Sequence, residues 1–111
     1  MEHYKLDAMT KGWFVGNFHP SSHQTEACEV GLKHYRQGDR EATHYHKIAT
    51  EITLVALGKI RMCGRVWETN DIIVLSPGES TDFEALTDSI TVVVKTPGAS
   101  NDKYLVFNSM C

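Results

Sequence analysis

The sequence has few cysteines and no long apolar run. Only three of its 111 residues are cysteines, at Cys28, Cys63 and Cys111, and no two of them form a CxxC pair. This odd, scattered set argues against a disulfide framework and against a structural zinc knuckle. No stretch approaches the roughly 20 apolar residues of a membrane-spanning helix. The N-terminal MEHYKLDAMTKG lacks the apolar core of a signal peptide, so we predict a cytoplasmic protein.

An excess of positive charge is also missing. The chain carries 11 lysines and arginines against 14 aspartates and glutamates, a formal net charge of −3. This balance gives no electrostatic reason to expect nucleic acid or an acidic membrane as a partner, and we predict neither. Hydrophobic residues make up 41% of the chain, which is ordinary for a globular protein. At this length we predict one domain with a single core, spanning residues 1–111.

Helical periodicity is absent as well, and short strand-like runs take its place. Glu26–Tyr35 alternates in its side chains, and Ile52–Leu57 and Lys59–Cys63 flank Gly58 like the two strands of a hairpin. We predict eight or more strands, which besides these three include Trp13–Phe18, Arg65–Trp67, Ile72–Leu75, Asp82–Leu86, Ser89–Lys95 and Lys103–Phe107. Many short strands at regular spacing predict an all-β sandwich or barrel.

The most informative stretch is Gly38–Gly58, which contains two histidines and a glutamate. His44 and His46 are two residues apart, so in a strand both imidazoles project from one face, about 7 Å apart. Glu51 follows after an odd number of residues, so it joins them only if a bulge or turn interrupts the strand at Lys47–Thr50. Two imidazoles and a carboxylate suit a divalent transition metal. The alternative is a strand with partly exposed histidines and a solvated glutamate.

This stretch resembles the first motif of the cupin superfamily, which reads glycine-x5-His-x-His-x4-Glu-x6-glycine. The chain matches every fixed position, at Gly38, His44, His46, Glu51 and Gly58. The second cupin motif, glycine-x5-Pro-x-glycine-x2-His-x3-Asn, corresponds to residues 70–85 and is degenerate. Gly78 matches it, but Asn70 and Ala85 do not, and Thr81 stands where the third histidine ligand is expected. The resemblance implies a double-stranded β-helix, the jelly-roll barrel of the cupins.

The resemblance also implies a metal site inside the barrel. The ion would be iron, manganese, nickel or zinc, held by His44, His46 and Glu51. Asp82 is a candidate fourth ligand, and the alternative is that it belongs to a polar turn entering a strand. The pocket around the ion is predicted to include Lys33, Tyr35, Arg61, Thr81 and Phe83. The charged members of this set would hold an anionic group, although solvated residues on the outer face of a sheet would look the same.

Two functions are consistent with these residues. The first is a small metal-binding cupin, of unassigned reaction, that acts on or binds a small polar or anionic molecule. The second is a non-catalytic small-molecule-binding or regulatory cupin with a weak or absent metal site, which the loss of the third histidine favours. Ser89–Lys95 contains a run that is apolar on both faces, which indicates cover on both sides by the N-terminal segment or a second subunit. We predict a homodimer.

Overall fold

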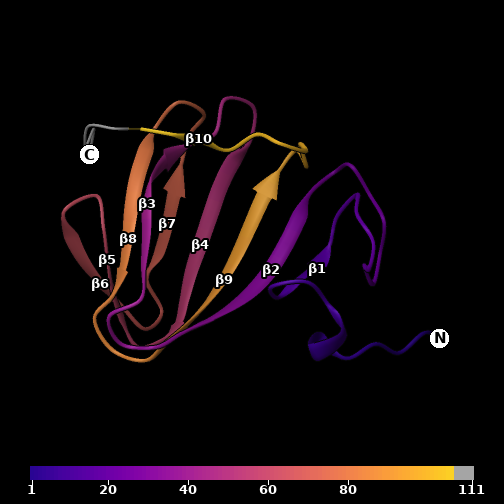
Figure 1. The fold of residues 1–111 in the computed structure, drawn as a ribbon, viewed down its shortest axis with the longest axis horizontal. Coiled ribbons are helices and arrows are strands. Elements are labelled where there is room, and N and C mark those ends of the chain that lie inside the picture. The colour runs from indigo at the N-terminus through magenta and orange to yellow at the C-terminus, as the bar shows by residue number, and fades with distance from the viewer. Residues whose placement is uncertain (107–111) are drawn as a thin grey trace.

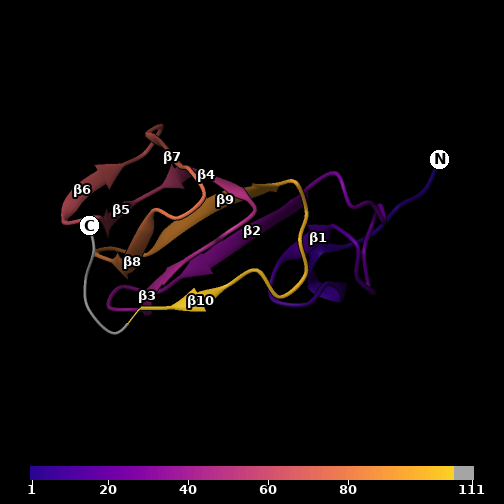
Figure 2. The same ribbon diagram turned by 90° about the horizontal axis from the view of Figure 1, so that it is seen from above.

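Two antiparallel sheets pack face to face in the computed structural model, which describes residues 1–106 (Figures 1 and 2). Within this range the elements are the 3-10 helix η1 Leu6–Ala8 and the strands β1 Trp13–Val15, β2 Glu29–Tyr35, β3 Arg40–Tyr45, β4 Thr50–Leu57, β5 Lys59–Met62, β6 Arg65–Glu68, β7 Ile72–Leu75, β8 Ser80–Ala85, β9 Ser89–Thr96 and β10 Tyr104–Leu105. Sheet A has the order β1-β2-β9-β4-β7, and sheet B has the order β10-β3-β8-β5-β6. The predicted all-β fold, a double-stranded β-helix of two facing sheets, is confirmed.

Most strands fall where the alternation of side chains predicts them, with differences at their ends. β7 has its predicted bounds, whereas β1 stops at Val15 rather than at Phe18. β4 begins two residues earlier than predicted, at Thr50. β10 ends at Leu105, and Phe107, its predicted end, lies outside the described residues, as does Cys111.

The predicted hairpin across Gly58 is wrong. β4 pairs with β7 and β9 in sheet A, whereas β5 pairs with β6 and β8 in sheet B. The chain therefore crosses between the sheets at Gly58, where φ is +99° and a Cβ atom would lie 2.4 Å from Ser89 Oγ. Only glycine fits this backbone at so close an approach. A glycine between two alternating runs does not by itself distinguish a hairpin from such a crossing.

The space between the sheets is apolar at one end and polar at the other. Val55, Ile60, Met62, Leu75, Phe83 and Ala85 form the buried apolar cluster. Ile60 has no exposed surface, and full burial of such a side chain stabilises the fold by about 1.5–3 kcal/mol. Glu51 and Val55 both point inward from β4, but Glu51 lies four residues earlier on the strand. There it is among the buried polar residues His44, Thr81 and Thr91. The polar end is where a binding site can form.

The N-terminal segment lies at the β1 edge of sheet A. Leu32 N–H on β2 donates to Gly12 O, which ties this segment to the sheet. Figure 1 shows η1 beside β1, away from β4 and β7. The outer face of sheet A is therefore left open over its central strands. No helix among residues 1–106 has the length and apolar character needed to cross a membrane.

Candidate metal centre

Strand β3, the turn after it and strand β4 bring three metal-binding side chains together. β3 ends at Tyr45 and β4 begins at Thr50, so the predicted interruption between the histidines and Glu51 is present. The ligand atoms of His44, His46 and Glu51 all lie within 4.8 Å of one another, and the three residues are buried. In the described part of the chain, no second group of three histidine, cysteine or acidic residues meets in this way.

Main-chain carbonyls orient both imidazoles toward the interior. Nδ1 of His44 is 2.9 Å from Ala42 O, and Nδ1 of His46 is hydrogen-bonded to Asp102 O. A carbonyl oxygen can only accept, so each Nδ1 carries the hydrogen and each Nε2 keeps a free lone pair. The rings lie edge to face with centroids 5.5 Å apart. Both histidines are thus held in the tautomer that binds a metal through Nε2.

Asp102 supports this arrangement from a distant part of the sequence. Besides the carbonyl that accepts from His46, its carboxylate accepts N–H bonds of 2.9–3.2 Å from Lys47, Ile48 and Ala49. Burial alone would raise the pKa of Asp102, but these N–H bonds and the nearby His46 hold the pKa below its ordinary value. An ionised Asp102 therefore closes the turn that reverses the chain between His46 and Glu51.

The donor set fits a divalent metal ion. His46 Nε2 is buried and makes no hydrogen bond to any residue in the range 1–106, and Glu51 Oε1 lies 3.9 Å from it, beyond hydrogen-bond distance. A buried polar atom left without a partner costs about 1–3 kcal/mol, and a bound cation would remove this cost. Burial lowers the pKa of His44, and the charge of Lys103 acts in the same direction. His44 is therefore held as the neutral imidazole that a metal requires.

The position of the missing third histidine is occupied by Thr81. Thr81 on β8 is the register partner of His44 on β3, and its side chain lines the same cavity. Its hydroxyl donates to Asp82 O at 2.6 Å, so it is committed to the main chain. Asp82 follows Thr81 directly and, because side chains alternate, points away from the buried face. The structure does not bring the predicted fourth ligand, Asp82, to the histidines.

A small cavity of about 30 Å³ adjoins His44 and Glu51, and its wall also includes Tyr35, Glu41, Thr81 and Phe83. Tyr35 packs on Phe83 with ring centroids 4.3 Å apart, and its hydroxyl donates to Glu41 Oε1 at 3.0 Å. Burial raises the pKa of Tyr35, and the charge and hydrogen bond of Glu41 raise it further. Tyr35 therefore keeps its proton and acts as a hydrogen-bond donor here. The predicted pocket residues Tyr35, Thr81 and Phe83 do meet at this cavity.

Glu41 is a cavity residue that the sequence analysis did not identify. It lies three residues before His44, an odd spacing that in a regular strand would put the two on opposite faces. The pairing of β3 with β8 shifts register between Glu41 and His44, which brings both side chains to the inner side. Nothing in the sequence marks this bulge, because it contains neither glycine nor proline.

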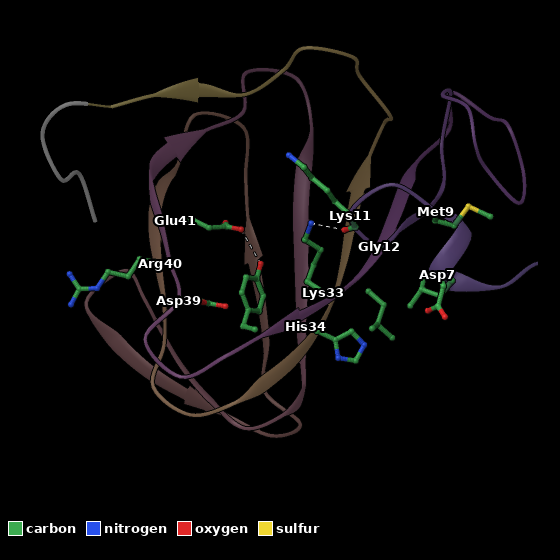
Figure 3. A pocket seen from close by; sticks show the side chains of 12 residues that line it. Asp7, Met9, Lys11, Gly12, Lys33, His34, Asp39, Arg40 and Glu41 are labelled. Atoms are coloured by element: carbon green, nitrogen blue, oxygen red, sulfur yellow. Dashed lines mark hydrogen bonds between the residues drawn. The ribbon is translucent and has the colours of Figure 1, made fainter.

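A larger cavity of about 610 Å³ lies outside the small one and shares Tyr35 and Glu41 with it (Figure 3). Lys33 lines this outer cavity and donates from Nζ to Lys11 O at 2.8 Å. Figure 3 shows Lys11 and Lys33 extending into the cavity between the N-terminal segment and Glu41. Burial lowers the pKa of Lys33, and neighbouring lysines contribute to the shift. The predicted pocket residue Lys33 is thus at the mouth of the site.

Arg61 is not part of either cavity. On β5 the buried residues Ile60 and Met62 face the core, so the intervening Arg61 points outward. There it donates to Glu84 Oε1 at 3.0 Å, on the outer face of sheet B. The predicted pocket role of Arg61 is therefore corrected. This is the solvated outer-face position that the sequence left open as the alternative.

Solved structures match the fold of this chain, although no family model and no curated protein sequence matches it. A Klebsiella pneumoniae protein, described as an uncharacterized conserved protein with a double-stranded beta-helix domain, matches with a TM-score of 0.67 and 23% identity. The match covers 76% of this chain and 74% of that protein. An RmlC-like cupin from Shewanella frigidimarina matches with a TM-score of 0.61 and 17% identity, over 70% of this chain and 72% of that one.

A metalloprotein is among the matched structures. Oxalate decarboxylase from Bacillus subtilis, which has Mn(II) centres, matches with a TM-score of 0.62 and 18% identity. The match covers 74% of this chain but only 25% of that longer protein. At these identities the likeness establishes a shared fold. The function has to be argued from the residues of the site.

Proposed function

Because the chain has the cupin fold, we propose that it is a metal-binding cupin whose ion is held by His44, His46 and Glu51. The observation that carries this proposal is the buried Nε2 of His46, which has no hydrogen-bond partner in the described chain and faces Glu51. The ion would be iron, manganese, nickel or zinc. It would supply Lewis acidity to an oxygen atom of a bound molecule. The Mn(II) centres of a structural neighbour support a metal on this fold.

The neighbouring side chains favour a small polar or anionic molecule beside the ion. Three protein ligands leave coordination positions open, and Thr81 takes less space there than an imidazole would. Tyr35 keeps its proton at all ordinary pH values, and Glu41 lies at hydrogen-bond distance from it. These two residues would orient a polar group that enters from the outer cavity, because they line both cavities.

The alternative function is a non-catalytic cupin that captures a small molecule and has a weak or absent metal site. The observation that favours it is Thr81, which stands in place of a third imidazole and whose hydroxyl is already hydrogen-bonded to Asp82 O. Asp82 does not compensate, because it points away from the buried face. The two functions differ in whether a metal is held tightly and in whether the bound molecule is changed.

Metal analysis of untagged protein tests the proposal. We expect about one ion per chain, retained on dialysis or restored by adding iron, manganese, nickel or zinc. His46→Ala and Glu51→Gln should each lower metal affinity by 100-fold or more, since each removes one of only three ligands. His23→Ala is the matched control, because His23 is exposed and outside the group. Wild-type protein that holds no metal and cannot be reloaded would rule out the metal centre in favour of the alternative.

The outer face of sheet A supports a second proposal, that the protein is a homodimer. Register pairs form two apolar rows across four strands, Val30–Val94–Ile52–Val74 and Leu32–Val92–Leu54–Ile72. Ile72 is 62% exposed and Val74 57%. A continuous apolar sheet face of this kind favours association.

A second copy of the chain is the occupant that this face fits best. Its eight residues are uncharged, so two copies can meet face to face without charge repulsion, as a two-fold interface requires. The N-terminal segment, which was the other predicted cover, lies at the β1 edge and meets these rows at Leu32, with which Leu6 and Met9 line two cavities. Because a standard interface buries about 800 Å² per partner, the rows would form the centre of the contact and flanking residues its rim.

A further inference from the structure

The cavity beside His44 and Glu51 is too small for an organic molecule. Its volume of about 30 Å³ has room for about one or two water molecules. His44 is 6% exposed and Glu51 9%, so both are almost wholly buried. The outer cavity of about 610 Å³ has the size of a ligand site, but neither residue lines it. A molecule in the outer cavity is therefore close to the proposed metal ligands without touching them.

Two side chains separate the two cavities, because Tyr35 and Glu41 are the residues that line both. Tyr35 is on β2 in sheet A and Glu41 is on β3 in sheet B, so the hydrogen bond between them joins the two sheets. It is the dashed line at Glu41 in Figure 3. Within residues 1–106 the carboxylate of Glu41 makes this one hydrogen bond and no ion pair. A single contact thus closes the passage between the cavities.

The main chain beside this contact is fixed. In the turn of residues 36–39, which joins β2 to β3, the N–H of Arg36 donates to Asp39 Oδ2 at 2.8 Å and the N–H of Asp39 donates to Arg36 O at 3.0 Å. The N–H of Gly38 donates to Ala85 O at 2.8 Å, which ties the turn to β8. The passage therefore opens through rotation of the two side chains that close it, and not through movement of a loop.

We propose that Tyr35 and Glu41 form a gate that determines which molecules reach His44 and Glu51. While their hydrogen bond is intact, the inner cavity admits water-sized molecules. An organic molecule that occupies the outer cavity reaches the inner one when the two side chains part. The gate itself follows from the two cavities and the contact between them, whereas its role in selecting molecules for a metal ion rests on the proposed function.

Labelling of His44 with diethyl pyrocarbonate, followed residue by residue by mass spectrometry, tests the gate in the metal-free full-length chain. The reagent acylates a neutral imidazole nitrogen and is too large for the inner cavity, so the labelling rate of His44 reports how often the gate is open. We expect slow labelling in the wild type and labelling about tenfold faster in Tyr35→Phe, which lacks the hydroxyl that closes the gate. Glu41→Gln keeps a neutral acceptor and should show a smaller increase. His34, which is exposed in the outer cavity, should be labelled rapidly and equally in all three proteins.

Two control variants separate opening of the gate from other effects. Tyr45→Phe removes a tyrosine hydroxyl outside both cavities, and Ile60→Ala destabilises the core without touching the gate. Both should label His44 at the wild-type rate. If Tyr35→Phe labels His44 no faster than the wild type, or if Ile60→Ala accelerates labelling equally, the gate is overturned and the metal centre is unaffected. If labelling follows the gate in a chain that takes up no metal, the gate stands and the metal centre fails.

Discussion

Asp102 binds both His46 and the turn that follows it, although it lies 56 residues beyond His46 in the sequence. The main-chain carbonyl of Asp102 orients the imidazole, and its carboxylate binds the three N–H groups that follow His46. One residue near the end of the described chain thus sets both the tautomer of a metal ligand and the turn that delivers Glu51. Such outer partners commonly change metal affinity by 10–100-fold when they are removed.

Replacing Asp102 should therefore weaken metal binding without touching a ligand. Asp102→Ala leaves three buried or partly buried N–H groups without an acceptor, so we expect a loss of about 2–4 kcal/mol in the free energy of unfolding. Metal affinity should fall by about tenfold or more, as measured by competition with a chelator. Asp102→Asn keeps one carbonyl oxygen and should show intermediate losses.

Asp82→Asn is the matched control for this experiment. Asp82 was predicted as a fourth ligand but points away from the buried face, so the variant should keep wild-type metal affinity. A loss of affinity in Asp82→Asn equal to that in Asp102→Ala would contradict the geometry described for β8.

The sequence predicted most of the inner metal group because the information there is local. His44, His46 and Glu51 lie within eight residues. Because side chains alternate along a strand and Glu51 follows His46 at an odd spacing, the three can meet only across a turn, which the structure contains. Asp102 was out of reach because nothing local links it to His46. Glu41 was missed for a different reason, since a bulge in β3 reverses the face that simple alternation assigns to it.

Thr81→His should rebuild the missing ligand position. Thr81 is the register partner of His44 and is only 1% exposed, so a histidine there would face the other two. We expect metal affinity to rise by tenfold or more, measured by chelator competition. The larger ring must fit beside a cavity of about 30 Å³, so the metal-free variant should lose about 1–3 kcal/mol of stability. Unchanged metal affinity in a folded variant would show that position 81 does not reach the ion.

A substitution in the apolar core should lower the free energy of unfolding more than a substitution at the surface. Ile60→Ala removes buried methyl and methylene groups from a fully buried residue and should cost about 2–5 kcal/mol in urea unfolding. Leu57→Ala is the control, because Leu57 is 54% exposed, and its cost should stay below about 1 kcal/mol. Equal losses in the two variants would contradict the assignment of the core.

The same two residues illustrate how far alternation specifies the fold. Leu57 and Ile60 flank Gly58, and their patterns place each on a strand correctly. Which sheet each strand joins is set by partners far along the chain, β9 for β4 and β8 for β5, so the crossing at Gly58 was read as a hairpin. Of the apolar outer rows of sheet A, the sequence predicted only the part on β9. The rows themselves arise from the register of four strands, which the sequence does not specify locally.

Val92→Lys should break the proposed dimer. Val92 lies on the outer face of β9, in the row Leu32–Val92–Leu54–Ile72, and a charge there would be buried against its own copy. We expect wild-type protein to sediment as a dimer and the variant as a monomer, with metal content unchanged. Val92→Thr keeps the shape without the charge and should weaken association less. Wild-type protein that stays monomeric at about 100 μM would exclude the interface.

The pH dependence of stability should report the burial of Lys33 directly. The charged groups that face Lys33 are Glu41 on β3, Lys95 on β9 and Lys11 and Lys103 in the flanking segments. Burial first, and then the three lysines against the opposing Glu41, lower the pKa of Lys33 from its ordinary value of about 10.5. Between the lowered pKa and that value the unfolded chain binds more protons than the folded one, so stability should rise with pH there.

Urea unfolding of metal-free protein between pH 7 and about 10.5 checks this trend. Lys33→Gln removes the titrating ammonium group, so the trend should flatten, whereas Lys59→Gln should retain it. Parallel stability profiles for wild type and Lys33→Gln would mean that Lys33 is solvated like any surface lysine.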